Sequence, residues 1–105
     1  MSGELNIREE NTGEAVTVFL SGEVDIYSAQ SLKERLYALA DSIKSDLRID
    51  CTELNYIDST GLGIFVGALK KTKQYGGKIY IKNLKDSIKK LFLITGLDKV
   101  FIIEE

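Results

Sequence analysis

The spacing of apolar residues changes several times between a period of two and a period of about 3.6, and this change limits the possible folds more than any other feature. Period-two runs predict strands at 5–8, 16–20, 47–51 and 78–81. Helical periodicity predicts helices at 29–44, from 59 to about 75 and at 84–92, with a last strand or apolar tail at 100–103. The order ββαβαβαβ is typical of an α/β domain.

The predicted sheet is mixed and has four to five strands. Asn11, Thr12 and Gly13 are turn residues and predict an antiparallel hairpin at the start of the chain. The later strands are separated by helices, and strand–helix–strand units give parallel neighbours with right-handed crossovers. With 105 residues the chain is long enough for one domain, 1–105, and too short for two.

The composition argues against nucleic-acid-binding, membrane and secreted proteins. The net charge is −2 and basic residues are interspersed with acids, so we expect no nucleic-acid partner. The longest apolar stretch, 62–69, is far shorter than the roughly 20 residues of a membrane span, so we expect no membrane association. The first ten residues lack the apolar segment of a signal peptide, and the single cysteine indicates a reducing compartment. Both features favour the cytoplasm.

Few residues are suited to catalysis. The chain has no histidine, which removes Ser-His-Asp and Cys-His mechanisms and the usual metal ligands. We therefore expect a protein that is not an enzyme and has no cofactor and no metal. Asp50, at the end of a predicted strand, would suit an aspartyl-phosphate receiver, but no adjacent acidic pair follows the first strand, so we interpret it as a polar strand-end residue. Cys51 has no flanking cation and is interpreted as buried and inert.

Two loops are expected to meet at one edge of the sheet. Loops that leave the carboxyl ends of parallel strands gather on the same side, and these are the segments 22–28 and 52–59. Asp25, Tyr27 and Ser28 are therefore predicted to lie near Asp58 and Ser59. Ser28 also has the residue type and position of an N-cap for the first helix.

The segment NYIDSTGLGIFVGALKK at 55–71 places three glycines in a predicted helix. Each glycine in a helix interior costs about 0.5–1 kcal/mol relative to alanine, so another purpose is served. On a helical wheel the predicted core face comprises Leu62, Phe65, Val66, Leu69 and Lys73. Gly63 and Gly67 form a bare stripe on the other side, flanked by Thr60, Ile64, Lys70 and Lys71. The stripe serves either internal packing or docking of another protein, and the core face is complete without it, which favours docking.

Four blocks of the sequence carry a resemblance to a known family. They are GEVDIYSA at 22–29, DSTGLG at 58–63, GGK at 76–78 and LITGL at 93–97. Together they resemble the anti-sigma factor antagonists of the STAS-domain family, most of all the antagonists of the general-stress sigma-B pathway. The resemblance implies that the protein binds an anti-sigma factor that is also a serine kinase, and so frees a sigma factor for transcription. It further implies that the kinase phosphorylates Ser59 and that a phosphatase reverses this modification.

The expected partner-binding surface combines the two loops with the glycine stripe. It comprises Asp25, Tyr27, Ser28, Asp58, Thr60, Gly61, Gly63, Ile64 and Gly67. A phosphate on Ser59 would add about −1.5 to −2 charge beside two carboxylates and so weaken the partner's binding. The alternative is a STAS domain that senses a nucleotide or small ligand, with the same rim as its pocket. An aspartyl-phosphate receiver is a more distant third.

Overall fold

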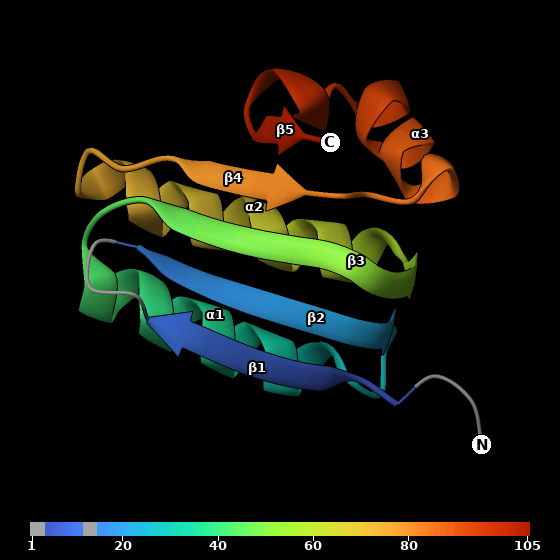
Figure 1. Ribbon diagram of the computed structural model, residues 1–105, viewed down its shortest axis with the longest axis horizontal. Coiled ribbons are helices and arrows are strands. Elements are labelled where there is room, and N and C mark those ends of the chain that lie inside the picture. Colours follow the sequence, from blue (N-terminus) through green and yellow to red (C-terminus); the bar gives the residue numbers. More distant parts are fainter. Residues whose placement is uncertain (1–3, 12–14) are drawn as a thin grey trace.

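The computed structural model describes residues 4–11 and 15–105, and it contains one five-stranded sheet with strand order β1-β2-β3-β4-β5 (Figure 1). The strands are β1 (Asn6–Asn11), β2 (Val16–Val24), β3 (Leu47–Ile57), β4 (Ile79–Lys82) and β5 (Ile102–Glu104). The helices are α1 (Ala29–Ile43), α2 (Ser59–Gln74), α3 (Asp86–Thr95) and the short 3₁₀ helix η1 (Leu97–Lys99).

The pairing confirms the predicted single α/β domain with a mixed sheet. Strand β1 is antiparallel to β2, and every later neighbour is parallel. Residues 12 and 13 of the predicted turn lie outside the described residues, but the pair Asn11–Val16 closes the ladder on either side of them. The last apolar run forms strand β5 at the edge of the sheet.

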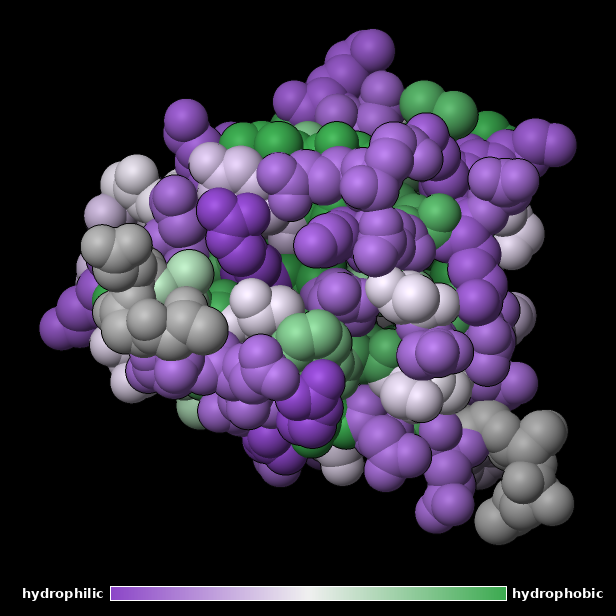
Figure 2. Space-filling view, in the orientation of Figure 1, coloured by the Kyte–Doolittle hydropathy of each residue, from purple (hydrophilic) through white to green (hydrophobic). Residues whose placement is uncertain are grey.

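Helices α1 and α2 lie side by side on one face of the sheet, as Figure 1 shows. Successive right-handed crossovers that advance in one direction place their helices on the same side. The opposite face carries mainly hydrophilic side chains (Figure 2). One row across this face, given by the strand register, runs through Arg8, Phe19, Asp50, Lys82 and Glu104.

The core fills the layer between the sheet and the helices. Alternate strand residues such as Val18, Leu20 and Ile49 are buried there because successive side chains of a strand point to opposite faces. Phe65 of α2, Phe92 of α3 and Phe101 pack with ring centroids 5.8–6.4 Å apart. This cluster joins α3 to α2. Helix α3 lies near the end of the sheet where the parallel strands finish (Figure 1).

Strands β2 and β3 are longer than predicted. Strand β2 continues to Val24 and β3 to Ile57, so the predicted loops at 22–28 and 52–59 begin later. The ladder between them shifts register between Phe19 and Ser21 and again between Gly22 and Glu23. Such irregularities break the period of two, because an extra residue turns the following side chains over. Asp50 therefore lies inside β3, and its interpretation as a strand-end residue was wrong.

The buried face of α2 is wider than the helical wheel predicted. Ile64, Ala68 and Thr72 are buried, whereas Lys73 of the predicted core face is exposed and Val66 is half-buried. Helix α2 packs against α1 as well as against the sheet, so two sides of it are covered. The predicted end of α3 is confirmed, because Gly96 follows its last residue in the left-handed conformation with φ 77°.

Candidate functional site

The carboxyl ends of β2 and β3 lie next to each other at one end of the sheet. Val24 pairs with Ile57 in the ladder, and the amide of Asp58 donates to the carbonyl of Val24 at 3.3 Å. The loop 25–28 therefore starts beside the start of α2, at the right-hand end of Figure 1. This end of the molecule, comprising residues 25–28 and 58–60, is called the rim below. The predicted proximity of the two loops is present in the structure.

Ser59 is the first residue of α2, and its side chain is exposed. Asp58 is the N-cap residue with φ −104° and ψ −174°, and its carboxylate accepts a hydrogen bond from the amide of Gly61 at 3.0 Å. A carboxylate at this position satisfies one of the free amides of the first turn and favours the helix. Thr60 is exposed as well, so the rim presents two adjacent hydroxyl groups to solvent.

Asp25 organises the loop in front of α1. One of its carboxylate oxygens accepts from the amides of Tyr27 at 2.9 Å and Ser28 at 3.1 Å. The hydroxyl of Ser28 lies 2.9 Å from the carbonyl of Glu23 and accepts from the amide of Asp25 at 3.0 Å. Ser28 occupies the N-cap position as predicted, but its side chain holds the loop and does not cap the helix.

The three glycines of α2 have different surroundings. A Cβ on Gly61 would lie 2.6 Å from side-chain atoms of Ile57 and Val24, so this glycine allows the helix start to approach the sheet. A Cβ on Gly67 would lie 1.8 Å from the hydroxyl oxygen of Tyr37 on α1. A Cβ on Gly63 would meet no atom within 4 Å. The proposed stripe is therefore wrong at Gly67, where internal packing uses the space, and only Gly63 is bare.

Ile64 also differs from its predicted place. It belongs to the hydrophobic core and is 7% exposed, so it offers almost no surface to a partner. The sequence pattern missed a different residue, Ile26, which is 70% exposed beside Tyr27 at 90%. The sequence did contain a signal for this exposure. Ile26 is an apolar residue in the loop between a predicted strand and a predicted helix, so neither periodic pattern assigns it to the core.

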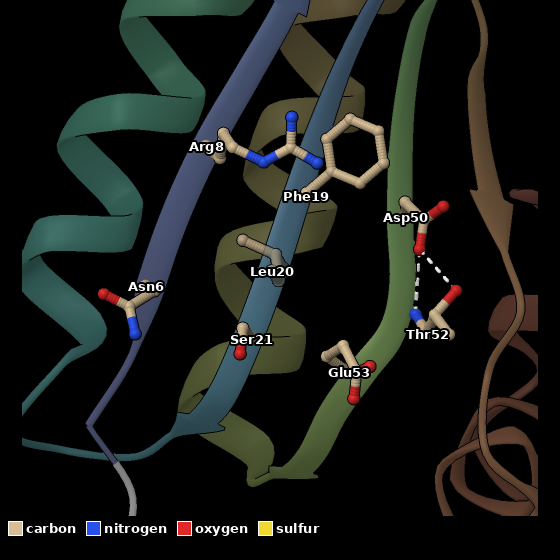
Figure 3. Close-up of a pocket in the computed structure, with 8 residues that line it drawn as sticks. All are labelled: Asn6, Arg8, Phe19, Leu20, Ser21, Asp50, Thr52 and Glu53. Atoms are coloured by element: carbon tan, nitrogen blue, oxygen red, sulfur yellow. Dashed lines mark hydrogen bonds between the residues drawn. The ribbon is translucent and has the colours of Figure 1, made fainter.

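A shallow hollow of about 380 Å³ lies on the open face of the sheet (Figure 3), and no rim residue lines it. Residues from β1, β2 and β3 line it: Asn6, Arg8, Phe19, Leu20, Ser21, Asp50, Thr52 and Glu53. The guanidinium of Arg8 lies 4.0 Å from the centre of the Phe19 ring and pairs with Glu10 at 2.6 Å. Two carboxylates in the wall, Asp50 and Glu53, disfavour a phosphate group there.

Cys51 and Asp50 are the two other residues that the sequence suggested for chemistry. Burial, assisted by the charge of Asp50, raises the pKa of the Cys51 thiol far above its usual value, which favours the protonated thiol. Asp50 accepts hydrogen bonds from the amide and hydroxyl of Thr52, at 2.9 and 2.6 Å. Within the described residues, no three His, Cys, Asp or Glu side chains gather closely enough to hold a metal ion. No helix in residues 4–11 and 15–105 has the length and apolarity to cross a membrane.

Comparison with known proteins identifies the class. The STAS domain family model matches residues 6–105, and the chain belongs to this family. It is 41% identical over 96 residues to the anti-sigma-B factor antagonist of Bacillus subtilis strain 168. The matched region covers 91% of this chain and 87% of that protein. The predicted resemblance to the anti-sigma factor antagonists of the STAS-domain family is confirmed.

Solved structures share the fold at lower identity. An anti-sigma factor antagonist from Mycobacterium paratuberculosis matches with a TM-score of 0.83 and 24% identity, over 96% of this chain and 86% of that one. The Bacillus cell fate determinant SpoIIAA in its phosphorylated form matches with a TM-score of 0.74 and 19% identity, over 93% and 90% of the two chains.

Proposed function

We propose that this protein is an anti-sigma factor antagonist that is switched by phosphorylation of Ser59. In its unphosphorylated form it binds an anti-sigma factor through the rim, and the sigma factor held by that protein is released for transcription. The observation that carries the proposal is the placement of Ser59. It is an exposed hydroxyl at the first position of α2, with the loop 25–28 beside it and Gly63 bare one turn further on.

The switch acts through charge at the interface. A phosphate on Ser59 adds about −1.5 to −2 charge next to Asp58 and close to the acidic loop residue Asp25. Asp58 already occupies the amide of Gly61, so the helix start offers the phosphate less compensation than an uncapped helix would. A cost of roughly 3–4 kcal/mol in repulsion and desolvation would weaken partner binding a few hundredfold.

The fold itself is expected to tolerate the modification. Ser59 is exposed, and none of its side-chain atoms is needed by the core. The existence of a phosphorylated structure with the same fold supports this view for the family. The affinity therefore changes because the partner meets a different surface, and the domain keeps its shape.

The proposal includes the enzymes that set the phosphorylation state. The anti-sigma factor itself is the serine kinase, a separate phosphatase removes the phosphate, and the antagonist performs no catalysis of its own. Sigma factors act on cytoplasmic RNA polymerase, so this exchange takes place in the cytoplasm. Ser59 is exposed, so its hydroxyl is accessible to the kinase and its phosphate ester would be accessible to the phosphatase.

The decisive experiment is phosphorylation of the pure protein by its kinase. We would incubate it with the organism's own anti-sigma factor and ATP, and locate any phosphate by mass spectrometry of the intact protein and its peptides. Modification of Ser59 in the wild type and its loss in Ser59→Ala are expected. Unchanged labelling of Ser59→Ala would reject Ser59 as the acceptor and point to Thr60.

A second measurement addresses the consequence of the phosphate. Isothermal titration of both forms against the anti-sigma factor is expected to show binding by the unmodified protein and a few-hundredfold loss in the phosphorylated protein. Equal affinity of the two forms would remove the electrostatic switch.

A further inference from the structure

We propose that Ile26 and Tyr27 form the apolar anchor by which the rim docks onto its partner, with Asp25 as a positioning residue. The two side chains are neighbours in the chain, and they are 70% and 90% exposed. Scattered single apolar residues are ordinary on a protein surface, whereas adjacent large ones beside a candidate site form an apolar patch that a partner can cover. This inference rests on the proposed function and names the contact that supplies its affinity.

The loop that carries the anchor is held in one conformation. The carboxylate of Asp25 binds the amides of Tyr27 and Ser28, and the carbonyl of Asp25 accepts from the amide of Ala29 at 2.9 Å. Ala29 is the first residue of α1 and is itself buried. Ser28 ties the same loop to the carbonyl of Glu23 at 2.9 Å. The apolar pair is thus fixed at both ends although the pair itself is exposed.

A fixed display of apolar side chains favours binding. When a loop is ordered before association, the complex loses less conformational entropy as it forms. Tyrosine is also among the residues that most often contribute strongly to protein interfaces, because its ring buries a large area with few rotatable bonds. In a monomer without a partner, the exposed side chains of Ile26 and Tyr27 contribute nothing to stability.

The occupant of this surface is the anti-sigma factor, because the anchor is continuous with the Ser59 site. The hydrogen bond from the amide of Asp58 to the carbonyl of Val24 joins the start of α2 to the residue directly before Asp25. Ile26 and Tyr27 follow Asp25 directly in the chain, so they stand beside the start of α2. A complementary partner surface therefore has an apolar pocket for Ile26 and Tyr27 next to the surface that meets Ser59.

Single substitutions test the anchor directly. Ile26→Ala and Tyr27→Ala should each weaken binding of the organism's own anti-sigma factor about 10- to 100-fold in isothermal titration. Thermal unfolding of each variant should match the wild type, because exposed side chains contribute little to the core. Tyr75→Ala is the matched control, since Tyr75 is also exposed, at 40%, but follows the far end of α2.

The outcomes separate this inference from the proposed function. If the wild type binds and both variants bind equally well, the anchor is refuted and the antagonist function stands. If the wild type does not bind the anti-sigma factor, the proposed function itself fails. Equal weakening in Tyr75→Ala would also refute the anchor, because the effect would not be specific to the rim.

Asp25 is tested by a pair of variants that separate geometry from charge. Asp25→Asn keeps a side-chain oxygen for the amides of Tyr27 and Ser28 but removes the charge, whereas Asp25→Ala removes both. A positioning role predicts near wild-type affinity for Asp25→Asn and weak binding for Asp25→Ala. If Asp25→Asn binds as weakly as Asp25→Ala, the carboxylate contacts the partner by its charge and the positioning role is wrong.

Discussion

Gly67 of α2 lies directly beneath the hydroxyl of Tyr37 on α1, so close that an added Cβ would come within 1.8 Å of that oxygen. The ring of Tyr37 is flanked by the ammonium groups of Lys71 at 5.4 Å and Lys33 at 5.6 Å. Lys71 in turn pairs with Asp41 of α1 at 3.1 Å. Gly67 therefore leaves the space on α2 that the end of the Tyr37 side chain occupies.

Gly67→Ala is expected to destabilise the protein by about 1 kcal/mol. Overpacking costs typically 1–3 kcal/mol, and the better helix propensity of alanine returns about 0.5–1 kcal/mol. Urea denaturation measures the difference. In the background of Tyr37→Ala the same substitution should cost nothing, so the double-mutant cycle should show clear coupling. Additive effects of the two substitutions would contradict the contact.

Gly63→Ala should have the opposite effect on stability. Nothing lies within 4 Å of the new methyl group, so the variant should gain about 0.4–1 kcal/mol and melt at a higher temperature. If a partner's backbone approaches Gly63, the same methyl should weaken binding of the anti-sigma factor roughly 5- to 150-fold. Unchanged affinity would show that the partner stays away from this position.

Ser59→Asp should fold normally and bind weakly. An acid in the first turn of a helix stabilises it by about 0.3–1 kcal/mol, and repulsion from Asp58 offsets part of this gain. The added charge should nevertheless reduce affinity for the anti-sigma factor by about tenfold or more, in the direction of the phosphorylated form. Calorimetric titration beside Ser59→Ala, which adds no charge, provides the comparison.

Asp58→Ala should cost about 0.5–2 kcal/mol of folding stability through the loss of the N-cap. Its carboxylate is the acceptor for the amide of Gly61, which would then lack its side-chain partner. Asp58→Asn should retain most of the stability, because asparagine caps a helix about as well. Equal losses in both variants would mean that the charge at the helix start, and not the hydrogen bond, is the stabilising factor.

Cys51 should give the protein a distinct alkaline sensitivity. Burial raises the pKa of its thiol in the folded state, whereas the unfolded chain releases the proton near the usual value of 9.0. Above about pH 9 the unfolded state therefore holds fewer protons, and stability falls by up to about 1.4 kcal/mol per pH unit. Urea denaturation at pH 8, 9 and 10 should show a steeper decline in the wild type than in Cys51→Ala. Parallel declines would indicate that other groups cause the effect.

The element order and many element ends were determined by the sequence alone. Alternating periods identified strands β1 to β4 and helices α1 to α3, left β5 as a strand or apolar tail, and missed the short helix η1. Local residue chemistry marked several ends, such as Gly96 with its left-handed backbone after α3. The nearness of residues 25–28 and 58–59 also followed from sequence, because parallel strands present their carboxyl ends on the same side. These features depend on backbone preferences and short-range spacing, which a linear pattern records.

The tertiary structure decided what individual side chains of the rim and of α2 do. Strands β2 and β3 continue past their predicted ends, through register shifts in their ladder that interrupt the alternation of side chains used to predict them. Gly63 and Gly67 look alike in the sequence, but only Gly67 has a tyrosine from another helix above it. Likewise, Ile64 and Ile26 are the same residue type, but Ile64 is buried and Ile26 is exposed. The surroundings of a residue depend on contacts between segments distant in the chain, and hydrophobicity alone does not specify those contacts.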